Sequence, residues 1–188
     1  MKLSILIPSL FKRQSLLDSL LSELNKQITE CNAHSEVEVI VKQDNKEVTT
    51  GEKRNQLLEL AKGEYIVFID DDDEIYFNYL LLILEAIETN VDCIGTQGHY
   101  SINGSHKTLW KLSKDYADHD GNDGILYRRA NHLSPVKRVH ALNAKFPHIS
   151  NAEDKAYSER LNKYLKTETV IDFPIYHYKY SSYNKEYV

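Results

Sequence analysis

Residues 65–74 have the sequence YIVFIDDDDE, in which five apolar residues run directly into four aspartates and a glutamate. A short apolar run that is rich in β-branched and aromatic side chains is typical of a strand buried on both faces. The carboxylates that follow cannot belong to the core, because their mutual repulsion costs stability unless positive groups relieve it. We therefore expect a central strand over residues 65–69 and a cation-binding site at its carboxyl end.

Strands and helices alternate on the amino-terminal side of this stretch. Residues 4–7 are apolar and are followed by Pro8, which predicts a short buried strand that ends there. Residues 37–41 predict a second strand, and Thr49 with Glu52 forms a Thr-x-x-Glu capping box that opens a helix. Between the two strands, apolar residues recur at the spacing of a helix: Leu16, Leu17, Leu20, Leu21, Leu24 and Ile28.

The same alternation continues past the acidic run. Gly63 is placed to end the capped helix before the central strand begins. Residues 78–89 predict a strongly apolar helix, and residues 91–94 a fourth short strand. The resulting order βαβαβαβ calls for a mostly parallel sheet with helices on both faces, so we expect the α/β fold class.

The pattern changes after residue 95. Asn103 and Gly104 predict a β-hairpin, and a large aromatic residue such as Trp110 on its second arm is more often core than a surface that stacks a ligand. A polar loop over residues 118–124 precedes a strand-like segment over residues 125–127. The last expected elements are an amphipathic segment between Pro135 and Phe146, a helix from Ala152 that includes Tyr164 and Leu165, and a strand around Val170 and Ile171.

Composition limits the class of protein. The 188 residues suit one domain over residues 1–188, and the apolar share of 41% with a charged share of 27% is ordinary for a globular protein. A formal charge of −5 argues against a protein that wraps nucleic acid or coats an anionic membrane. Cys31 and Cys93 are too few for a disulfide framework or a thiolate metal cage. Since no apolar run reaches about 18 residues and no signal peptide is recognised, we expect a cytoplasmic protein without a membrane span.

The acidic run indicates a hard divalent cation. Mg²⁺ and Mn²⁺ bind carboxylate oxygens and accept an incomplete protein shell where a substrate supplies phosphate oxygens. The position agrees, because open α/β sheets bind ligands at the carboxyl ends of their strands. Two plainer interpretations stay open, namely a solvated acidic turn and a helix-start role for Asp73 or Glu74.

Four segments, in order, resemble the family 2 glycosyltransferases of the GT-A fold, which transfer a sugar from a nucleoside diphosphate. They are residues 4–9 (SILIPS), 39–45 (VIVKQDN), 51–55 (GEKRN) and 68–73 (FIDDDD), and the last is similar to the Asp-x-Asp element of the family. The resemblance implies a mostly parallel central sheet flanked by helices, with a small β-hairpin region for the acceptor. It further implies a nucleotide-sugar-binding half over residues 1–95 and an acceptor half with the catalytic base over residues 96–188.

The resemblance also implies roles for side chains of the first half. Pro8 and Asp44 would contact the base, and Arg54 the base or the diphosphate, unless Arg54 is an ordinary exposed helix residue. Asp70 would lie in the ribose and metal region, and Asp72 would bind the metal. Two further residues of the same motifs complete the expected substrate-binding set: Ser9 and Asp71.

Departures from the family pattern bear on the base. The second strand of the family usually ends in two acidic residues and a Gly-Ser, whereas Gln43 precedes Asp44 here and Lys46 replaces the serine. Lys53 stands where a small residue is usual. Uridine is the base implied by the resemblance, and guanosine and thymidine donors stay open.

A second carboxylate must act as the general base, within hydrogen-bond reach of the acceptor hydroxyl. Glu153 and Asp154 open a predicted helix and resemble the Glu-Asp element whose aspartate is the base in inverting members. A helix N-terminus favours an ionised carboxylate. We therefore expect Asp154 to be catalytic and Glu153 to bind substrate, although the pair alone would be an ordinary acidic first turn.

The second half adds histidine and cationic candidates. By resemblance, His177 would join Asp70 and Asp72 at the metal, although a lone histidine is as often structural. His132 with its neighbours Lys137 and Arg138 could meet phosphate or an anionic acceptor. A solvated basic helix start is the more ordinary interpretation of the two cations.

The prediction is a metal-dependent inverting glycosyltransferase with Mn²⁺ or Mg²⁺ as its cofactor. It would move one sugar from a nucleoside diphosphate sugar, by default a UDP-sugar, to a hydroxyl of a glycan or another acceptor. A nucleic-acid acceptor is a variant, because basic residues gather between Lys107 and Arg138. Dinucleotide, Walker and hydrolase-elbow motifs are missing. Two alternatives remain, namely a nucleotidyltransferase and a catalytically silent module that binds a nucleotide sugar or a glycan.

Overall fold

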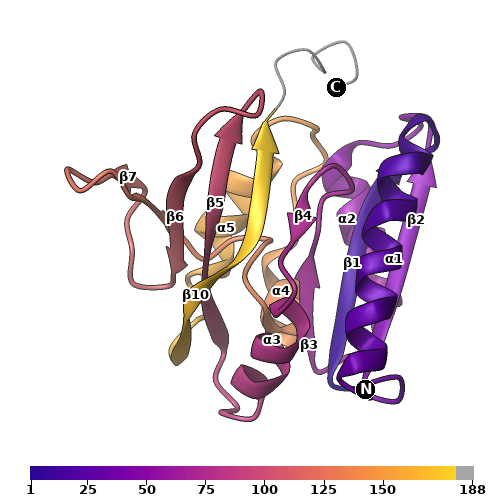
Figure 1. Cartoon of the computed structure of the whole chain (residues 1–188), viewed down its shortest axis with the longest axis horizontal. Coiled ribbons are helices and arrows are strands. Elements are labelled where there is room, and N and C mark those ends of the chain that lie inside the picture. Colours follow the sequence, from indigo (N-terminus) through magenta and orange to yellow (C-terminus); the bar gives the residue numbers. More distant parts are fainter. Residues whose placement is uncertain (181–188) are drawn as a thin grey trace.

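The computed structural model describes residues 1–180, in which ten strands form one mixed sheet flanked by helices (Figure 1). The strands are β1 (Leu3–Leu10), β2 (Val37–Asp44), β3 (Tyr65–Phe68), β4 (Glu74–Ile75), β5 (Cys93–Ile102), β6 (Thr108–Ser113), β7 (His119–Asp120), β8 (Leu126–Arg129), β9 (Val136–Lys137) and β10 (Glu168–Tyr180). The helices are the 3-10 turn η1 (Phe11–Arg13), α1 (Gln14–Glu30), α2 (Thr50–Leu60), α3 (Tyr79–Ile87), α4 (Arg138–Ala144) and α5 (Glu153–Leu161).

The strands run in the order β2-β1-β3-β9-β5-β6-β8-β7, and β10 pairs with β5 and β4. β1 is parallel to both β2 and β3, with Leu3 opposite Val37 on one side and Tyr65 on the other. β5 is parallel to β10 and antiparallel to β6. The α/β class and the parallel core of the sheet are therefore confirmed.

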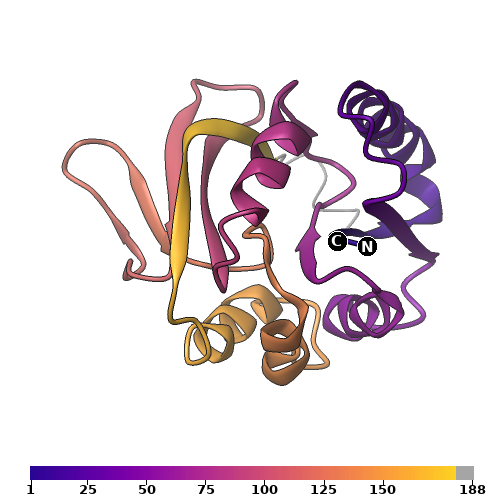
Figure 2. The ribbon, with the colours of Figure 1, turned by 90° about the horizontal axis from the view of Figure 1, so that it is seen from below.

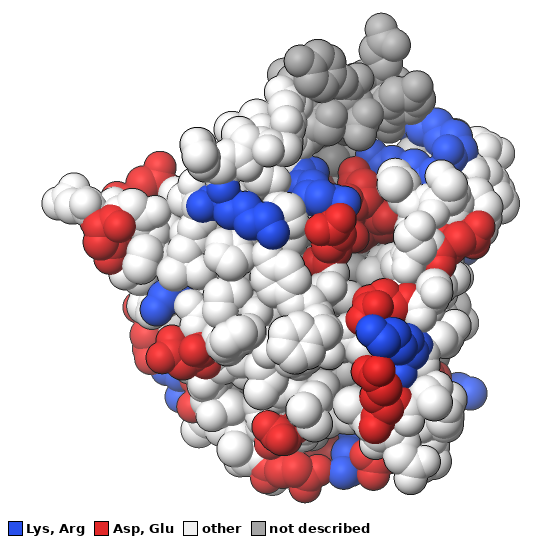
Figure 3. All heavy atoms as spheres, viewed as in Figure 1, with Lys and Arg blue, Asp and Glu red and all other residues white. Residues whose placement is uncertain are grey.

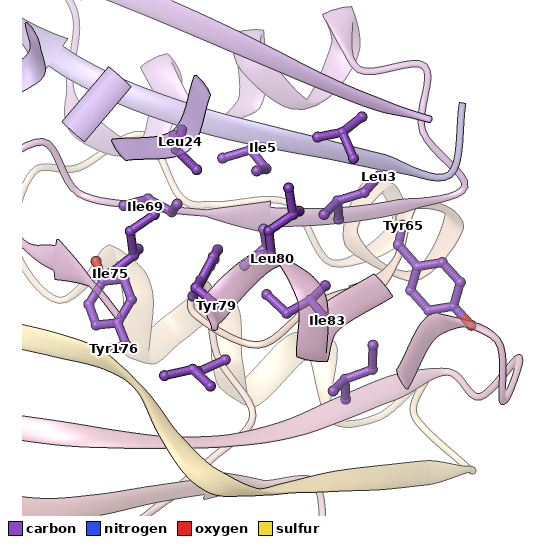
Figure 4. Close-up of a cluster of buried hydrophobic side chains, with 14 of the residues drawn as sticks. Leu3, Ile5, Leu24, Tyr65, Ile69, Ile75, Tyr79, Leu80, Ile83 and Tyr176 are labelled. Atoms are coloured by element: carbon purple, nitrogen blue, oxygen red, sulfur yellow. The ribbon is translucent and has the colours of Figure 1, made fainter. Parts of the chain in front are cut away.

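Helices cover both faces of the sheet, and each face has its own hydrophobic core (Figure 2). Alternate residues of β1 serve the two cores, since Ile5 packs on the side of α1 and α3 while Leu6 packs on the side of α2, α4 and α5. Figure 4 shows the first core, where Leu24 of α1 and Leu80 of α3 meet the central strands. Each fully buried leucine or isoleucine contributes roughly 1.5–3 kcal/mol to folding.

Two expectations about the ends of elements are wrong. Pro8 does not end the first strand, because β1 continues to Leu10 beside β2. β3 has its last partner opposite Leu6, so Pro8 has a neighbouring strand on one side only, as prolines in sheets usually do. Gly63 does not end α2, whose last residue is Leu60; instead, a Cβ at Gly63 would lie 2.5 Å from the Ser4 backbone N, so this position requires glycine for close contact with β1.

The second half contains elements that the sequence patterns only outlined. The hairpin at Asn103 and Gly104 is confirmed, and both residues have positive φ, at 50° and 74°. β9 is a two-residue strand that lies antiparallel between β3 and β5, and it was not predicted. The last helix stops at Leu161, short of the expected Tyr164 and Leu165, and β10 is far longer than its expected core at Val170 and Ile171.

Within residues 1–180, no helix has the length and apolar character needed to cross a bilayer. Tyr183 and Tyr187, part of a tyrosine-rich end of the sequence, lie outside the described residues.

Candidate active site

Two adjoining cavities lie where the strands of the parallel core end. The first has a volume of about 390 Å³, and its wall includes Pro8, Ser9 and residues 70–72. The second has a volume of about 600 Å³, and its wall includes Trp110, His132 and Asp154. Four residues line both cavities: Arg54, Asp70, Ser150 and Glu153. Some of the expected site residues therefore face two spaces that share a wall.

Arg54 is the centre of the shared wall. Its guanidinium is buried and pairs with Asp70 Oδ1 at 2.7 Å and Glu153 Oε1 at 2.8 Å, so the end of β3 and the start of α5 are joined through one side chain. Burial would lower the pKa of Arg54, but the two carboxylates raise it above its ordinary value. The guanidinium also lies over the rings of Phe68 and Phe146, at 5.9 and 5.4 Å from their centroids. Arg54 is therefore not an exposed helix residue.

Asp70 is a carboxylate of this wall whose charged form the surrounding cations favour. Burial alone would raise its pKa, but Arg54 and His132 hold the pKa well below the usual range of a carboxyl group. His132 is itself buried, with Nε2 at 3.4 Å from Asp70 Oδ2. The structure thus brings together His132 and Asp70, which the sequence separates by 62 positions.

Asp71 and Asp72 are both paired with Arg13, a cation that was not predicted as a site residue. Arg13, in the turn η1 after β1, donates to Asp71 Oδ1 at 2.8 Å and lies 3.2 Å from Asp72 Oδ2. Ser9 Oγ also donates to Asp71, at 2.7 Å. Both carboxylate oxygens of Asp71 therefore have partners within the protein, whereas Asp72 has the longer contact with Arg13. The only sequence signal for Arg13 was its position just after the strand that carries Pro8 and Ser9.

Asp72 is the carboxylate best suited to receive a divalent cation. Burial raises its pKa to about 6; Arg13 opposes this shift, and the neighbouring Asp70 and Asp71 add to it. Among residues 1–180, no three His, Cys, Asp or Glu side chains are arranged to hold a metal ion on their own. The donor set thus fits a Mg²⁺ or Mn²⁺ ion that one or two carboxylates hold and bound phosphate oxygens complete.

The rest of the acidic run is structural. Asp73 accepts hydrogen bonds from the Tyr176 hydroxyl and the Lys179 backbone N–H, both at 2.8 Å. His177 lies on β10 with Nδ1 at 3.2 Å from Glu74 Oε2 and Nε2 at 2.9 Å from Ser101 Oγ. His177 lines neither cavity, so the structure does not bring it to Asp72 as expected. Lys179 Nζ of β10 also pairs with Glu74 Oε1 at 2.9 Å. Figure 3 shows acidic and basic side chains side by side on this face of the molecule.

Asp44 is withdrawn from the cavity that it was expected to line. Its carboxylate is buried and forms an ion pair with Lys53, which also donates to the Ser9 carbonyl at 2.8 Å. Burial would raise the pKa of Asp44, but Lys53 and the Lys46 backbone N–H lower it. Lys53 stands in the wall of the first cavity, and Asp44 does not.

Asp154 lies in the first turn of α5, which follows Ala152 in the left-handed conformation at φ 59°. Its Oδ1 accepts the Lys155 backbone N–H at 2.8 Å, and the side chain lines the second cavity. Glu153, one residue earlier, points to Arg54 and lines both cavities. The Glu-Asp pair is thus divided between the shared wall and the second cavity.

The second cavity contains aromatic and cationic residues that were not predicted as site residues. Tyr100 on β5 and Tyr178 on β10 stack with centroids 5.5 Å apart, and Arg128 on β8 lies in the same wall. Trp110 is buried, as its core interpretation required, and it also borders this cavity. These residues are contributed by strand pairing across long sequence separations, which no local pattern indicates.

Lys137 and Arg138 lie away from both cavities. Lys137 is opposite Tyr65, the first residue of β3, whereas the site begins beyond the last residue of that strand. Lys137 Nζ donates to the Asn90 carbonyl at 3.0 Å, and Arg138 Nε donates to the Gly63 carbonyl at 3.2 Å. The two cations lie at the opposite end of the sheet, so the structure does not bring them to the cavities where they were expected to bind phosphate or acceptor.

Known proteins share this fold and sequence pattern. Residues 25–186 match glycosyl transferase family 2. The poly(ribitol-phosphate) beta-glucosyltransferase of Bacillus spizizenii is 29% identical over 133 residues, which are 69% of this chain and 21% of that protein. The chain therefore spans about a fifth of the length of that relative.

Crystal structures of S. aureus TarS superpose on most of the chain. Residues 1–349 of TarS give a TM-score of 0.68 at 17% identity, covering 95% of this chain and 60% of that one. The structure of the same TarS fragment in complex with UDP-GlcNAc gives a TM-score of 0.66 at 16% identity, covering 95% and 58%. At this identity the likeness shows the fold.

The likeness to TarS shows that the chain has the GT-A fold. Because the family match extends over most of its length, the chain belongs to glycosyl transferase family 2.

Proposed function

We propose that this chain transfers one sugar from a nucleoside diphosphate sugar to an acceptor hydroxyl, with inversion and with help from Mg²⁺ or Mn²⁺. The observation that carries the proposal is the wall shared by the two cavities. Asp72 stands on one side of it, Asp154 on the other, and Arg54 and Asp70 lie between them. A uridine donor is supported by the TarS complex with UDP-GlcNAc.

The residues of the first cavity bind and orient the donor. Asp72, with Asp70 beside it, would hold the divalent ion, which supplies positive charge for the departing diphosphate. Arg13 is near enough to Asp72 to meet the same diphosphate. The shared wall then directs the sugar toward the second cavity.

Asp154 acts from the second cavity as the general base. It takes the proton of the acceptor hydroxyl while the acceptor oxygen forms a bond to the anomeric carbon. The bond from that carbon to the diphosphate oxygen breaks, and its electron pair leaves with the nucleoside diphosphate. Because the base and the leaving group lie on opposite sides of the shared wall, a single displacement with inversion follows.

Calorimetric titration with UDP, GDP and dTDP, with and without Mn²⁺, tests the donor half. We expect the protein to bind one of these diphosphates in a metal-dependent manner, and Asp72→Ala to abolish that binding. Asp18→Asn, an exposed carboxylate of α1 outside both cavities, is the matched control. Absence of binding to all three by the folded protein would contradict the proposal.

The catalytic half is tested by measuring the release of nucleoside diphosphate from the matching sugar donor, with water alone and with added saccharides as acceptors. Asp154→Asn is expected to bind the diphosphate as tightly as the unaltered protein and to lose about 10²–10⁴-fold in rate. A silent module would bind the diphosphate and release none from the donor. A nucleotidyltransferase would instead form diphosphate bonds from nucleoside triphosphates and would not depend on Asp154.

A further inference from the structure

Lys53 is a buried cation in the wall of the first cavity, and the proposed mechanism does not use it. It belongs to the second turn of α2 and is only 5% exposed. Its ammonium donates to the Ser9 carbonyl at 2.8 Å and to Asp44 Oδ1. A lysine ammonium has three N–H donors, so these two acceptors leave one donor for another partner.

The pair formed by Lys53 and Asp44 is incomplete without a ligand. Asp44 Oδ2 is buried and has no hydrogen-bond partner. A buried ion pair with unfilled hydrogen bonds costs desolvation free energy that its mutual attraction does not recover, so it is poor evidence for a stabilising role. Since Lys53 lines the cavity and Asp44 does not, a bound molecule meets an ammonium that a carboxylate holds in place.

The position of Lys53 indicates which part of the donor it meets. The other buried or half-buried cations of this wall are paired with carboxylates of the acidic run, Arg13 with Asp71 and Arg54 with Asp70. In the proposed function, which this inference deepens, the diphosphate lies at Asp72 and the sugar points to the second cavity. Lys53 is instead tied to Asp44, the last residue of β2, at the edge of the parallel strands. Since the diphosphate and the sugar are assigned to other parts of the site, the base is the part of the donor that would lie at this edge of the sheet.

We propose that Lys53 is a specificity-determining residue for the donor base and that its free N–H binds the O4 keto oxygen of uracil or thymine, or the O6 keto oxygen of guanine. Asp44 is its positioning residue. Cytosine and adenine carry an amino group at the equivalent position, N4 or N6, which would set N–H against N–H. The carboxylate of Asp44, screened by Lys53, does not read the base directly.

UDP and CDP form the matched pair of probes, because their bases have the same size and differ at this edge. Calorimetry at one fixed Mg²⁺ concentration compares UDP, CDP and inorganic pyrophosphate. The unaltered protein is expected to bind UDP at least about tenfold more tightly than CDP, as for a lost charge-assisted hydrogen bond. In the double variant Lys53→Met/Asp44→Asn the ratio is expected to fall below about threefold, with pyrophosphate binding unchanged.

The double variant removes both charges, so that it leaves no buried carboxylate without a cation. Lys53→Met alone shows whether the buried Asp44 carboxylate, left without its cation, changes the preference, and Lys62→Met, an exposed lysine just after the same helix, is the control. An unchanged ratio of UDP to CDP affinity would overturn the inference. An equal loss for UDP, CDP and pyrophosphate would also overturn it, because Lys53 would then bind the diphosphate. If the unaltered protein binds no nucleotide, both the inference and the proposed function are wrong.

Discussion

At the scale of single residues, the four aspartates of the acidic run have four different environments. Asp70 is held charged by Arg54 and His132, Asp71 is paired with Arg13 and Ser9, and Asp73 is buried beneath β10. Asp72 alone combines access to the first cavity with a pKa raised to about 6. The sequence predicted a charged cluster, but the identity of each partner depends on residues up to 106 positions away, such as Lys179.

Arg13 is predicted to compete with divalent cations for Asp72, because its guanidinium lies 3.2 Å from the carboxylate. Arg13→Gln removes a positive charge beside the binding carboxylate, and we expect Mn²⁺ affinity without nucleotide to rise by about tenfold. Titration of Mn²⁺ followed by electron paramagnetic resonance measures this affinity. Arg160→Gln, an exposed arginine of α5, is the control. Unchanged Mn²⁺ binding by Arg13→Gln would contradict this competition, and weaker binding would show instead that Arg13 supports the cation site.

At the scale of elements, Asp92 joins three segments just before β5. Its Oδ1 lies 3.1 Å from His140 Nε2 of α4, and its Oδ2 accepts the backbone N–H groups of Lys166 and Thr167 at 3.0 and 3.1 Å. The Asp92 carbonyl also accepts the Lys137 N–H of β9 at 3.0 Å. One short connection therefore positions α4, β9 and the start of β10.

Asp92→Asn is predicted to lower the free energy of unfolding by about 1–3 kcal/mol near neutral pH. Burial would raise the pKa of Asp92, but the hydrogen bonds from His140, Lys166 and Thr167 lower it well below the ordinary value. A carboxyl group with a depressed folded pKa stabilises the protein above its unfolded pKa of about 4, and this contribution is lost as the pH falls toward the folded pKa. Urea unfolding between pH 3 and 7 should show the two proteins converging as the pH decreases. A constant difference across this range would exclude the charge of Asp92 as the cause.

The elements that sequence patterns predicted are those whose residues carry their own periodicity. α1 and α2 were identified from leucine spacing and a cap, and the hairpin at Asn103 was identified from its turn residues. β9 was not predicted, because two residues are too few to show a periodic pattern and its pairing with β3 and β5 is set by tertiary contacts. His177 lies outside both cavities for a related reason, since the length of β10 and its pairing with β5 and β4 determine where the histidine lies.

At the scale of the whole molecule, the candidate active site lies where residues from the first and second halves of the chain meet. The first cavity takes most of its wall from residues before 75, and the second takes most of its wall from residues after 99. Arg54 from the first half and Glu153 from the second form the ion pair that joins them. The sequence indicated both motifs, and their juxtaposition required the fold.

Removing the Arg54 cation is therefore predicted to weaken the whole fold as well as the site. Arg54→Met leaves the half-buried Asp70 and the buried Glu153 without their shared cation, so the free energy of unfolding should fall by about 3–5 kcal/mol. That is a large part of a typical total of about 5–15 kcal/mol. Arg54→Lys keeps the charge but cannot donate to both carboxylates in a planar fork, so its loss should be intermediate. Denaturant unfolding measures both, with Arg160→Met as the exposed control.

The triple variant Arg54→Met/Asp70→Asn/Glu153→Gln should recover most of the loss, because it removes the uncompensated charges. If it recovers nothing, packing of the arginine against Phe68 and Phe146 is what joins the two halves.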